Sequence, residues 1–191
     1  MKIKSFTFNN FQENTYILYD ETNECIIIDP GCYSEEEKKI LSEFVINNKL
    51  NPLKLINTHC HIDHVLGNQY VSKKWSLDLY LHRDSKPLLE QTKNIGKVYG
   101  FYDFEESPEP NYFLEHKQIL KFGLQEIIIL HTPGHAPGHI CLYNKKSNLL
   151  IAGDLIFKGS IGRTDLPGGN YETLINSIKT EIIILPEKTK I

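Results

Sequence analysis

The sequence predicts an α/β fold, in which buried strands alternate with helices along a single domain of residues 1–191. Three neighbouring segments support this prediction. The run Cys25–Asp29 is apolar until it stops at Asp-Pro-Gly, which is typical of a strand buried on both faces. Ser34 precedes three glutamates and an apolar stripe, which predicts a capped helix, and Leu53–Asn57 predicts the next strand.

Two short segments rich in β-forming residues precede this unit, Ile3–Phe8 and Asn14–Tyr19. The connection between them reads N-N-F-Q-E-N, which predicts a turn or short loop. We therefore expect an antiparallel pair of strands at the start of the chain.

The later elements are predicted from the spacing of apolar residues, which follows the helical turn in helices and alternates in strands. We expect helices in Val65–Trp75, Ser85–Gln91 and about Tyr171–Lys179, and strands in Leu79–Leu81, Gln125–Leu130, His139–Tyr143 and Leu149–Ala152. Residues 159–169 predict a glycine-rich loop. Residues 92–116 follow neither period and carry six aromatic residues, so they are interpreted as a loop packed by its aromatics or as the wall of a binding cleft.

Composition narrows the functional classes. The four cysteines contain no C-x-x-C pair, which favours a reducing compartment and predicts a cytoplasmic protein without a disulfide framework. We find neither a signal-peptide core nor an apolar run near the roughly 20 residues that span a bilayer. A net charge of −3 without a basic run predicts no nucleic-acid partner, and the lack of a long apolar run predicts no membrane partner. A small-molecule substrate is the expected partner, and the oligomeric state stays open.

Six of the eight histidines fall in two short segments. The first is N-T-H-C-H-I-D-H, residues 57–64, which begins where a predicted buried strand ends. In an extended segment His59, His61 and Asp63 project to one side, whereas His64 faces a neighbouring point. Imidazole and carboxylate are costly to bury without a partner, so this spacing predicts two adjacent metal sites.

The second segment is H-T-P-G-H-A-P-G-H, residues 131–139. Its prolines and glycines predict a stiff, irregular loop that holds His135 in place. Asp154 follows another predicted strand, and its carboxylate could bridge two cations about 3.5–4 Å apart. These nitrogen and oxygen donors favour one or two zinc ions, with iron or manganese as alternatives.

The stretch T-H-C-H-I-D-H resembles the T-H-x-H-x-D-H motif of the metallo-β-lactamase superfamily. The stretches H-T-P-G-H-A-P-G-H, G-D-L-I-F and G-S-I-G-R-T-D-L-P-G-G are similar to its glyoxalase II branch. This resemblance implies a four-layer αβ/βα sandwich with the metals at the edge between two mixed sheets. It further implies roles for eight residues: His59, His61 and His135 on the first metal, Asp63 and His64 on the second, Asp154 as the bridge, Asp29 as support behind the metal loops, and Arg163 as an anchor for an anionic substrate group.

The sequence departs from this family at its end. The family takes one more histidine from a turn after the last strand, and by the resemblance Thr189–Ile191 would begin that strand. Three interpretations stay open: the chain is truncated, another chain completes the site, or the second site is weakened. The helical domain with which glyoxalase II binds glutathione is also expected to be absent.

The resemblance implies hydrolysis of thioesters by a metal-activated water or hydroxide, with Asp63 orienting the nucleophile in addition to binding metal. One alternative is a persulfide dioxygenase-like oxidoreductase with a single iron, held by His59 or His61 together with His135 and Asp154. A second alternative is a catalytically silent metal-binding protein.

Simpler interpretations compete for the remaining residues. Arg163 is interpreted equally well as a salt bridge to Asp165. Cys60 is predicted to be a small buried hydrophobe, and His131 and His139 are predicted to pack and hydrogen bond rather than to bind metal.

Overall fold

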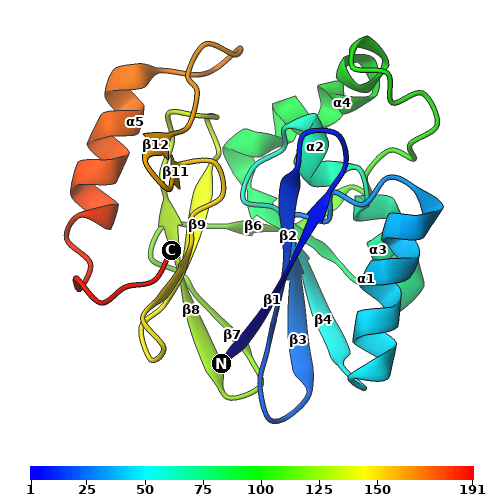
Figure 1. Ribbon diagram of the computed structural model, residues 1–191. Coiled ribbons are helices and arrows are strands. Elements are labelled where there is room, and N and C mark those ends of the chain that lie inside the picture. The colour runs from blue at the N-terminus through cyan, green and yellow to red at the C-terminus, as the bar shows by residue number, and fades with distance from the viewer.

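The computed structural model describes residues 1–191 and consists of two β-sheets packed face to face, with helices outside both (Figure 1). The helices α1 to α4 cover the six-stranded sheet, and α5 covers the four-stranded sheet on the opposite side. These four layers are the αβ/βα sandwich that the sequence resemblance implies, so the predicted fold class is confirmed.

The six-stranded sheet has the order β1-β2-β3-β4-β5-β6. Its strands are β1 Lys2–Phe8, β2 Glu13–Tyr19, β3 Glu24–Ile28, β4 Asn51–Ile56, β5 Leu79–His82 and β6 Pro110–Leu114. The first two pairings are antiparallel and the other three are parallel. The predicted antiparallel start is confirmed, as is the burial of β3, in which residues 25–28 are all buried.

The four-stranded sheet has the order β10-β9-β8-β7, and every pairing between these strands is antiparallel. Its strands are β7 Ile119–Phe122, β8 Gln125–His131, β9 Ile140–Asn144 and β10 Leu149–Ile151. Lys190 adds one isolated parallel bridge to Leu149, where the sequence predicts the start of a strand. A small hairpin follows, made of β11 Ile156–Phe157 and β12 Ser160–Ile161, so residues 159–169 are not loop throughout as predicted.

The helices are α1 Glu35–Asn47, α2 Ile62–Val65, α3 Asn68–Trp75, α4 Lys86–Val98 and α5 Tyr171–Ser177, with a 3₁₀ turn at Arg83–Ser85 and a π turn at Ile178–Ile182. Ser34 caps α1 as predicted: its hydroxyl accepts from the Glu37 N–H, and the Glu37 carboxylate accepts from the Ser34 N–H. No helix is both long enough and apolar enough to cross a membrane.

Three apolar clusters account for the layers. One lies mainly between the helices and the six-stranded sheet, a second lies between the two sheets, and a third lies between the four-stranded sheet and α5. Because consecutive side chains of a strand point to opposite faces, β3 supplies Cys25 and Ile27 to the first cluster and Ile26 and Ile28 to the second. Burial on both faces is why this strand reads as an unbroken apolar run.

Two helix predictions are wrong in their limits. The segment Val65–Trp75 is interrupted, because α2 ends at Val65 and α3 begins at Asn68. Gly67 lies at the break, where its N–H donates to the Pro30 carbonyl at 2.7 Å. A Cβ atom on Gly67 would lie 2.4 Å from the Cys32 Sγ, so only glycine allows this close approach.

The second wrong prediction is the helix expected in Ser85–Gln91, because α4 continues to Val98. Residues 92–116 therefore contain the end of α4 and the whole of β6. Gly96, inside α4, hid the helical period, yet Phe104 packs over it because there is no side chain in the way. Phe101 is buried and contacts Tyr33 with ring centroids 4.9 Å apart, so aromatic packing is confirmed for this part of the segment. Tyr102 remains 73% exposed and takes no part in that packing.

Candidate metal centre

The loop after β4 carries the first histidines. Its hydrogen bonds tie it to both sheets: Thr58 N–H donates to Asp29 Oδ1 at 2.7 Å, and the Thr58 carbonyl accepts from the Ile140 N–H at 2.8 Å. Prediction of an extended segment through His64 is wrong, since the chain turns into α2 at Ile62 with His61 at its N-cap position. The turn forms because the Asn57 side chain donates to the His64 carbonyl at 3.0 Å, which holds the far end of the segment back against the strand.

A first group of donors consists of His59, His61 and His135, with one ring nitrogen from each within 4.8 Å of the others. His135 Nε2 lies 2.8 Å from His61 Nδ1 and 3.2 Å from His59 Nε2. These residues come from opposite sheets, since His61 follows β4 and His135 follows β8. The tertiary structure therefore brings His135 to His61, 74 positions away in the sequence, and to His59, 76 positions away.

Hydrogen bonds on the outer side of two rings define which nitrogens are free. His135 Nδ1 donates to the Arg163 carbonyl at 2.8 Å, which leaves its Nε2 without a proton. Thr58 Oγ1 donates to Asp29 Oδ2 at 2.5 Å and so accepts from His59 Nδ1 at 3.1 Å, which leaves His59 Nε2 also without a proton. Two lone pairs then face each other at 3.2 Å, an arrangement that fits a cation between them and is otherwise repulsive.

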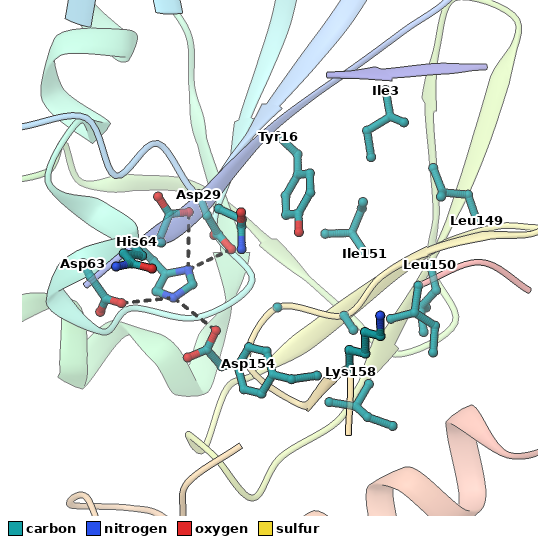
Figure 2. A pocket seen from close by; sticks show the side chains of 18 of the residues that line it. Ile3, Tyr16, Asp29, Asp63, His64, Leu149, Leu150, Ile151, Asp154 and Lys158 are labelled. Atoms are coloured by element: carbon teal, nitrogen blue, oxygen red, sulfur yellow. Dashed lines mark hydrogen bonds and ion pairs between the residues drawn. The ribbon is translucent and has the colours of Figure 1, made fainter. Parts of the chain in front are cut away.

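The second group contains Asp63, His64 and Asp154 (Figure 2). His64 Nε2 lies 3.5 Å from Asp63 Oδ2 and 3.4 Å from Asp154 Oδ1. On the other side of the ring, His64 Nδ1 lies 3.1 Å from Asp29 Oδ2. Asp29 thus sets the orientation of His64, which directs its Nε2 toward the two carboxylates.

Asp29 is itself close enough to His59 and His64 to count as a metal donor. Its oxygens, however, already accept from the Thr58 N–H and hydroxyl and from the Asn57 amide. These hydrogen bonds use the oxygens of Asp29 and hold it against the loop, so we do not include Asp29 in either donor group.

Asp154 reaches both groups. Its Oδ1 lies 3.4 Å from His64 Nε2, and its Oδ2 lies 3.5 Å from His135 Nε2. The Asp154 N–H donates to His139 Nε2 at 3.1 Å, and His139 Nδ1 contacts Thr132 Oγ1 at 3.0 Å. His139 therefore hydrogen bonds within the site, as predicted, and positions the backbone of the shared carboxylate.

The two groups differ in charge. Burial, followed by the charges of His64 and other histidines, lowers the pKa of His59, and burial with His135 lowers the pKa of His61 to about 3. His64 behaves oppositely: burial disfavours its protonation, yet Asp63, Asp154 and Asp29 outweigh burial and raise its pKa. The first group is hence neutral imidazole, the form that binds metal, whereas the carboxylates of the second group attract positive charge.

Glu13 is a site residue that sequence reasoning missed. Its side chain is fully buried, and its Oε1 lies 3.9 Å from His64 Nδ1 without a hydrogen-bond partner. Burial raises the pKa of Glu13 even though His64 opposes the shift. No local signal marks it, because a glutamate at the start of a strand is ordinarily a surface residue.

Arg163 and Cys60 also have defined places. The Arg163 guanidinium pairs with Asp165 through two bonds of 2.8 and 2.7 Å on the surface, while its backbone carbonyl holds His135. The salt bridge that competed with substrate contact is therefore present. Cys60 is fully buried within the apolar cluster between helices and sheet, and burial raises the pKa of its thiol, which makes it a hydrophobe as predicted.

A cavity of about 750 Å³ adjoins the second group. Asp63, His64 and Asp154 lie at one end, and apolar side chains such as Tyr16 and Ile151 line the space beyond (Figure 2). Asp63 and Asp154 keep 18% and 27% of their side-chain surface exposed, whereas His135 keeps only 2%. Small molecules can accordingly reach these two carboxylates more easily than they can reach His135 or the fully buried His59.

Comparison with known proteins agrees with this geometry. The family described as Metallo-beta-lactamase superfamily matches residues 9–188. The Bacillus subtilis (strain 168) protein named Probable metallo-hydrolase YqgX is 36% identical over 192 residues, which cover 99% of this chain and 87% of that protein. Hydroxyacylglutathione hydrolase GloC of Haemophilus influenzae is 32% identical over 186 residues, 97% of this chain and 86% of that protein.

Solved structures are similar over nearly the whole chain. The BLEG-1 B3 metallo-beta-lactamase superposes with a TM-score of 0.89 at 32% identity, covering 98% of this chain and 88% of that chain. TTHA1623 in a di-iron-bound form superposes with a TM-score of 0.83 at 33% identity, covering 96% and 88%. Together with the buried histidine and carboxylate groups, these similarities show that the chain belongs to the metallo-beta-lactamase superfamily and to its metallo-hydrolases.

Proposed function

We propose that this protein is a metal-dependent hydrolase whose substrates are thioesters. The observation that carries the hydrolase proposal is the position of Asp154, which directs one oxygen to each donor group. A carboxylate shared in this way is typical of sites with two metals close together. The thioester part rests on the similarity to the hydroxyacylglutathione hydrolase, which covers 97% of this chain.

The proposed ligand set follows the two groups. His59, His61 and His135 would hold one ion, Asp63 and His64 a second, and Asp154 both. Zinc, as one or two ions, suits this mixture of neutral imidazole and carboxylate, with iron or manganese as alternatives. When bound, such ions lower the pKa of a water toward 7 and polarise a carbonyl group.

Asp63 is proposed to orient the attacking water in addition to binding metal. It lies on the first turn of α2 beside the cavity, and the Asn9 side chain donates to its backbone carbonyl at 3.0 Å. Its carboxylate can accept a hydrogen bond from water and so direct the remaining lone pair at a substrate carbonyl.

Arg163 is proposed to anchor an anionic group of the substrate. The backbone carbonyl of Arg163 accepts from His135, which places this residue beside the metal centre. Its guanidinium lies on the surface and pairs with Asp165, and a bound anion would replace Asp165 as its partner. A small-molecule substrate is in keeping with the cavity. All four cysteines are unpaired and buried, which supports a cytoplasmic location.

A second candidate function is redox chemistry with a single iron. The three-histidine group is self-contained, and Asp154 Oδ2 lies 3.5 Å from one of its nitrogens, so nitrogen and carboxylate donors are available without the second group. The similarity to a protein solved in a di-iron-bound form favours testing iron in particular.

Metal analysis combined with three assays tests the proposal. Purified protein is analysed for zinc, iron and manganese and is assayed for hydrolysis of a glutathione thioester, hydrolysis of a β-lactam, and oxygen uptake with glutathione persulfide. We expect thioester hydrolysis, with Asp63→Asn lowering kcat by about 10²–10⁴-fold, the range for loss of a positioned proton acceptor. Oxygen uptake with one iron would support the second candidate instead. Less than one equivalent of metal would contradict both.

A further inference from the structure

A pair of buried asparagine side chains lies behind the second donor group. Asn57 directly follows β4, and Asn68 is the first residue of α3. Neither side chain is exposed to solvent. The Asn68 amide nitrogen donates to Asn57 Oδ1 at 2.8 Å, and the Asn57 amide nitrogen lies 3.3 Å from Asn68 Oδ1. Each amide therefore faces the other with both of its polar atoms.

The partners outside the pair fix the orientation of each amide. A backbone carbonyl can only accept a hydrogen bond, so Asn57 must present its nitrogen to the His64 carbonyl at 3.0 Å. Asn57 Oδ1 then points at Asn68, which has to donate. The other hydrogen of the Asn68 nitrogen goes to Ser107 Oγ at 3.0 Å. Reversing Asn68 would place two acceptor oxygens against each other, so only one assignment is consistent.

The pair joins segments that are distant in the sequence. Asn57 connects the end of β4 to the His64 carbonyl, and Asn68 connects α3 to Ser107, which lies between α4 and β6. His64 is thus held twice, its ring by Asp29 and its backbone by Asn57. Because both amides are buried, water cannot replace the hydrogen bond that Asn68 gives to Asn57.

We propose that Asn68 is a positioning residue for the second donor group. It hydrogen bonds to no donor of either group and does not line the cavity, so it acts through Asn57. Without Asn68, the oxygen of Asn57 loses its donor, and Asn57 can turn away from the His64 carbonyl. The helix α2, which carries Asp63 and His64, is then no longer held at this point. The inference rests on the ligand set of the proposed function.

Calorimetric titration of metal-free protein with zinc tests the inference. The unmodified protein should give two dissociation constants, and His61→Ala identifies the constant of the three-histidine group by raising it. Asn68→Leu keeps a side chain of similar size without hydrogen bonds. It should raise the other constant by about 10–100-fold, the range for loss of a partner behind a metal ligand. Asn68→Ala should do the same with a smaller side chain, so the test does not depend on the folding of one variant.

Asn144→Leu is the matched control. Asn144 is also buried, and its amide donates to the Glu126 carbonyl at 3.0 Å within the four-stranded sheet. Its replacement should leave both zinc constants unchanged. The inference is overturned if both Asn68 variants keep the constant of the second group, or if Asn144→Leu raises that constant equally.

Hydrogen exchange of the metal-free protein gives a second readout. The His64 N–H donates to the His61 carbonyl at 3.1 Å, and it should exchange about tenfold faster in Asn68→Leu than in Asn144→Leu. Equal exchange rates would contradict the positioning role. If the unmodified protein binds only one zinc ion, the two-metal ligand set of the proposed function fails, and the exchange rates alone decide whether Asn68 holds α2.

Discussion

The two donor groups of the metal centre are built on opposite principles. The group of His59, His61 and His135 is nitrogen only and drawn from both sheets, with His59 and His135 buried and His61 half-buried. The group of Asp63, His64 and Asp154 is mainly carboxylate, has a single imidazole, and adjoins a cavity of about 750 Å³. In the proposed function, the first group would hold a metal firmly, and the second would meet water and substrate.

The two groups also differ in the hydrogen-bond partners that orient their imidazole rings. The first group is oriented by neutral acceptors, the Thr58 hydroxyl and the Arg163 carbonyl. In the second group, the His64 ring is oriented by a charge, that of Asp29 at 3.1 Å. Removing a charge should consequently damage the second group selectively, whereas removing a ring should damage the first.

Substitution of a first-group ring should have the largest effect. His61→Ala removes one of three converging nitrogens, so we expect metal loss and a fall in hydrolysis of more than about 100-fold, beyond the loss that a merely supporting residue gives. Cys60→Ala is the matched control, because Cys60 is adjacent yet buried in the apolar cluster. Metal content and kcat/KM measured on both variants test whether His61, and not its neighbour Cys60, binds metal. An unchanged metal count in His61→Ala would refute the ligand assignment.

Asp29→Asn should weaken the second group more than the first, because Asp29 contacts the His64 ring directly and reaches His59 only through the Thr58 hydroxyl. Asparagine keeps the size of the side chain and tolerates the positive φ of 48° at this position, but it removes the charge that orients His64. Metal affinity at that group should fall by about 10–100-fold while the three-histidine group keeps its ion. Metal titration followed by mass spectrometry distinguishes loss of one ion from loss of two.

Asp20→Asn provides the control for Asp29→Asn. Asp20 is likewise buried, and its carboxylate accepts from the Leu124 N–H and the Gln125 side chain away from the site. Its replacement should leave both ions in place. Loss of both ions in Asp29→Asn would show that the two groups are not separable in this way.

Acid should destabilise the metal-free protein through the first group. The pKa of His61 is lowered to about 3 in the folded state, against an ordinary value of about 6.5, so unfolding binds a proton between these limits. Stability should therefore fall as the pH drops below about 6.5, by about 1.4 kcal/mol per pH unit for each such histidine. Urea unfolding of chelated protein at pH 7 and pH 5 measures this slope.

The second group should act in the opposite direction. Because the folded-state pKa of His64 is raised, its stabilising contribution is complete below the ordinary pKa and is lost as the pH rises through the raised value.

The His61→Ala variant isolates the contribution of His61 to the acid effect. In the same urea experiment, chelated His61→Ala should show a shallower loss of stability toward acid than the unmodified protein. Identical slopes would mean that His61 is protonated in the folded state.

Arg163→Ala should have the smallest effect. Its guanidinium lies on the surface and pairs with Asp165, so loss of an anchor there should raise KM about two- to fivefold with kcat unchanged. The backbone carbonyl that holds His135 is retained in this variant, so metal content should not change. A lower kcat with an unchanged KM would exclude the anchoring role.

Some features of the molecule are local, and these could be predicted. The strand run Cys25–Asp29, the cap at Ser34 and the histidines spaced through residues 57–64 each depend on neighbours within a few positions. Propensity, capping and the cost of burying unpaired imidazole therefore predicted the alternation of elements and all the residues that the structure gathers in the two groups.

Other features arise only from contacts between distant segments. The break at Gly67 exists because Pro30 and Cys32 approach it, and Glu13 joins the site only because β2 packs beside His64. Likewise, the difference in charge between the histidine group and the carboxylate group depends on the hydrogen bond that each ring makes on the side away from the other donors. The sequence by itself determined which donors are present. Tertiary structure decided which nitrogen is free, which ring is charged and which carboxylate spans both groups. These features depend on partners that are distant in the sequence: Arg163 for His135, and Asp29 and Asp154 for His64.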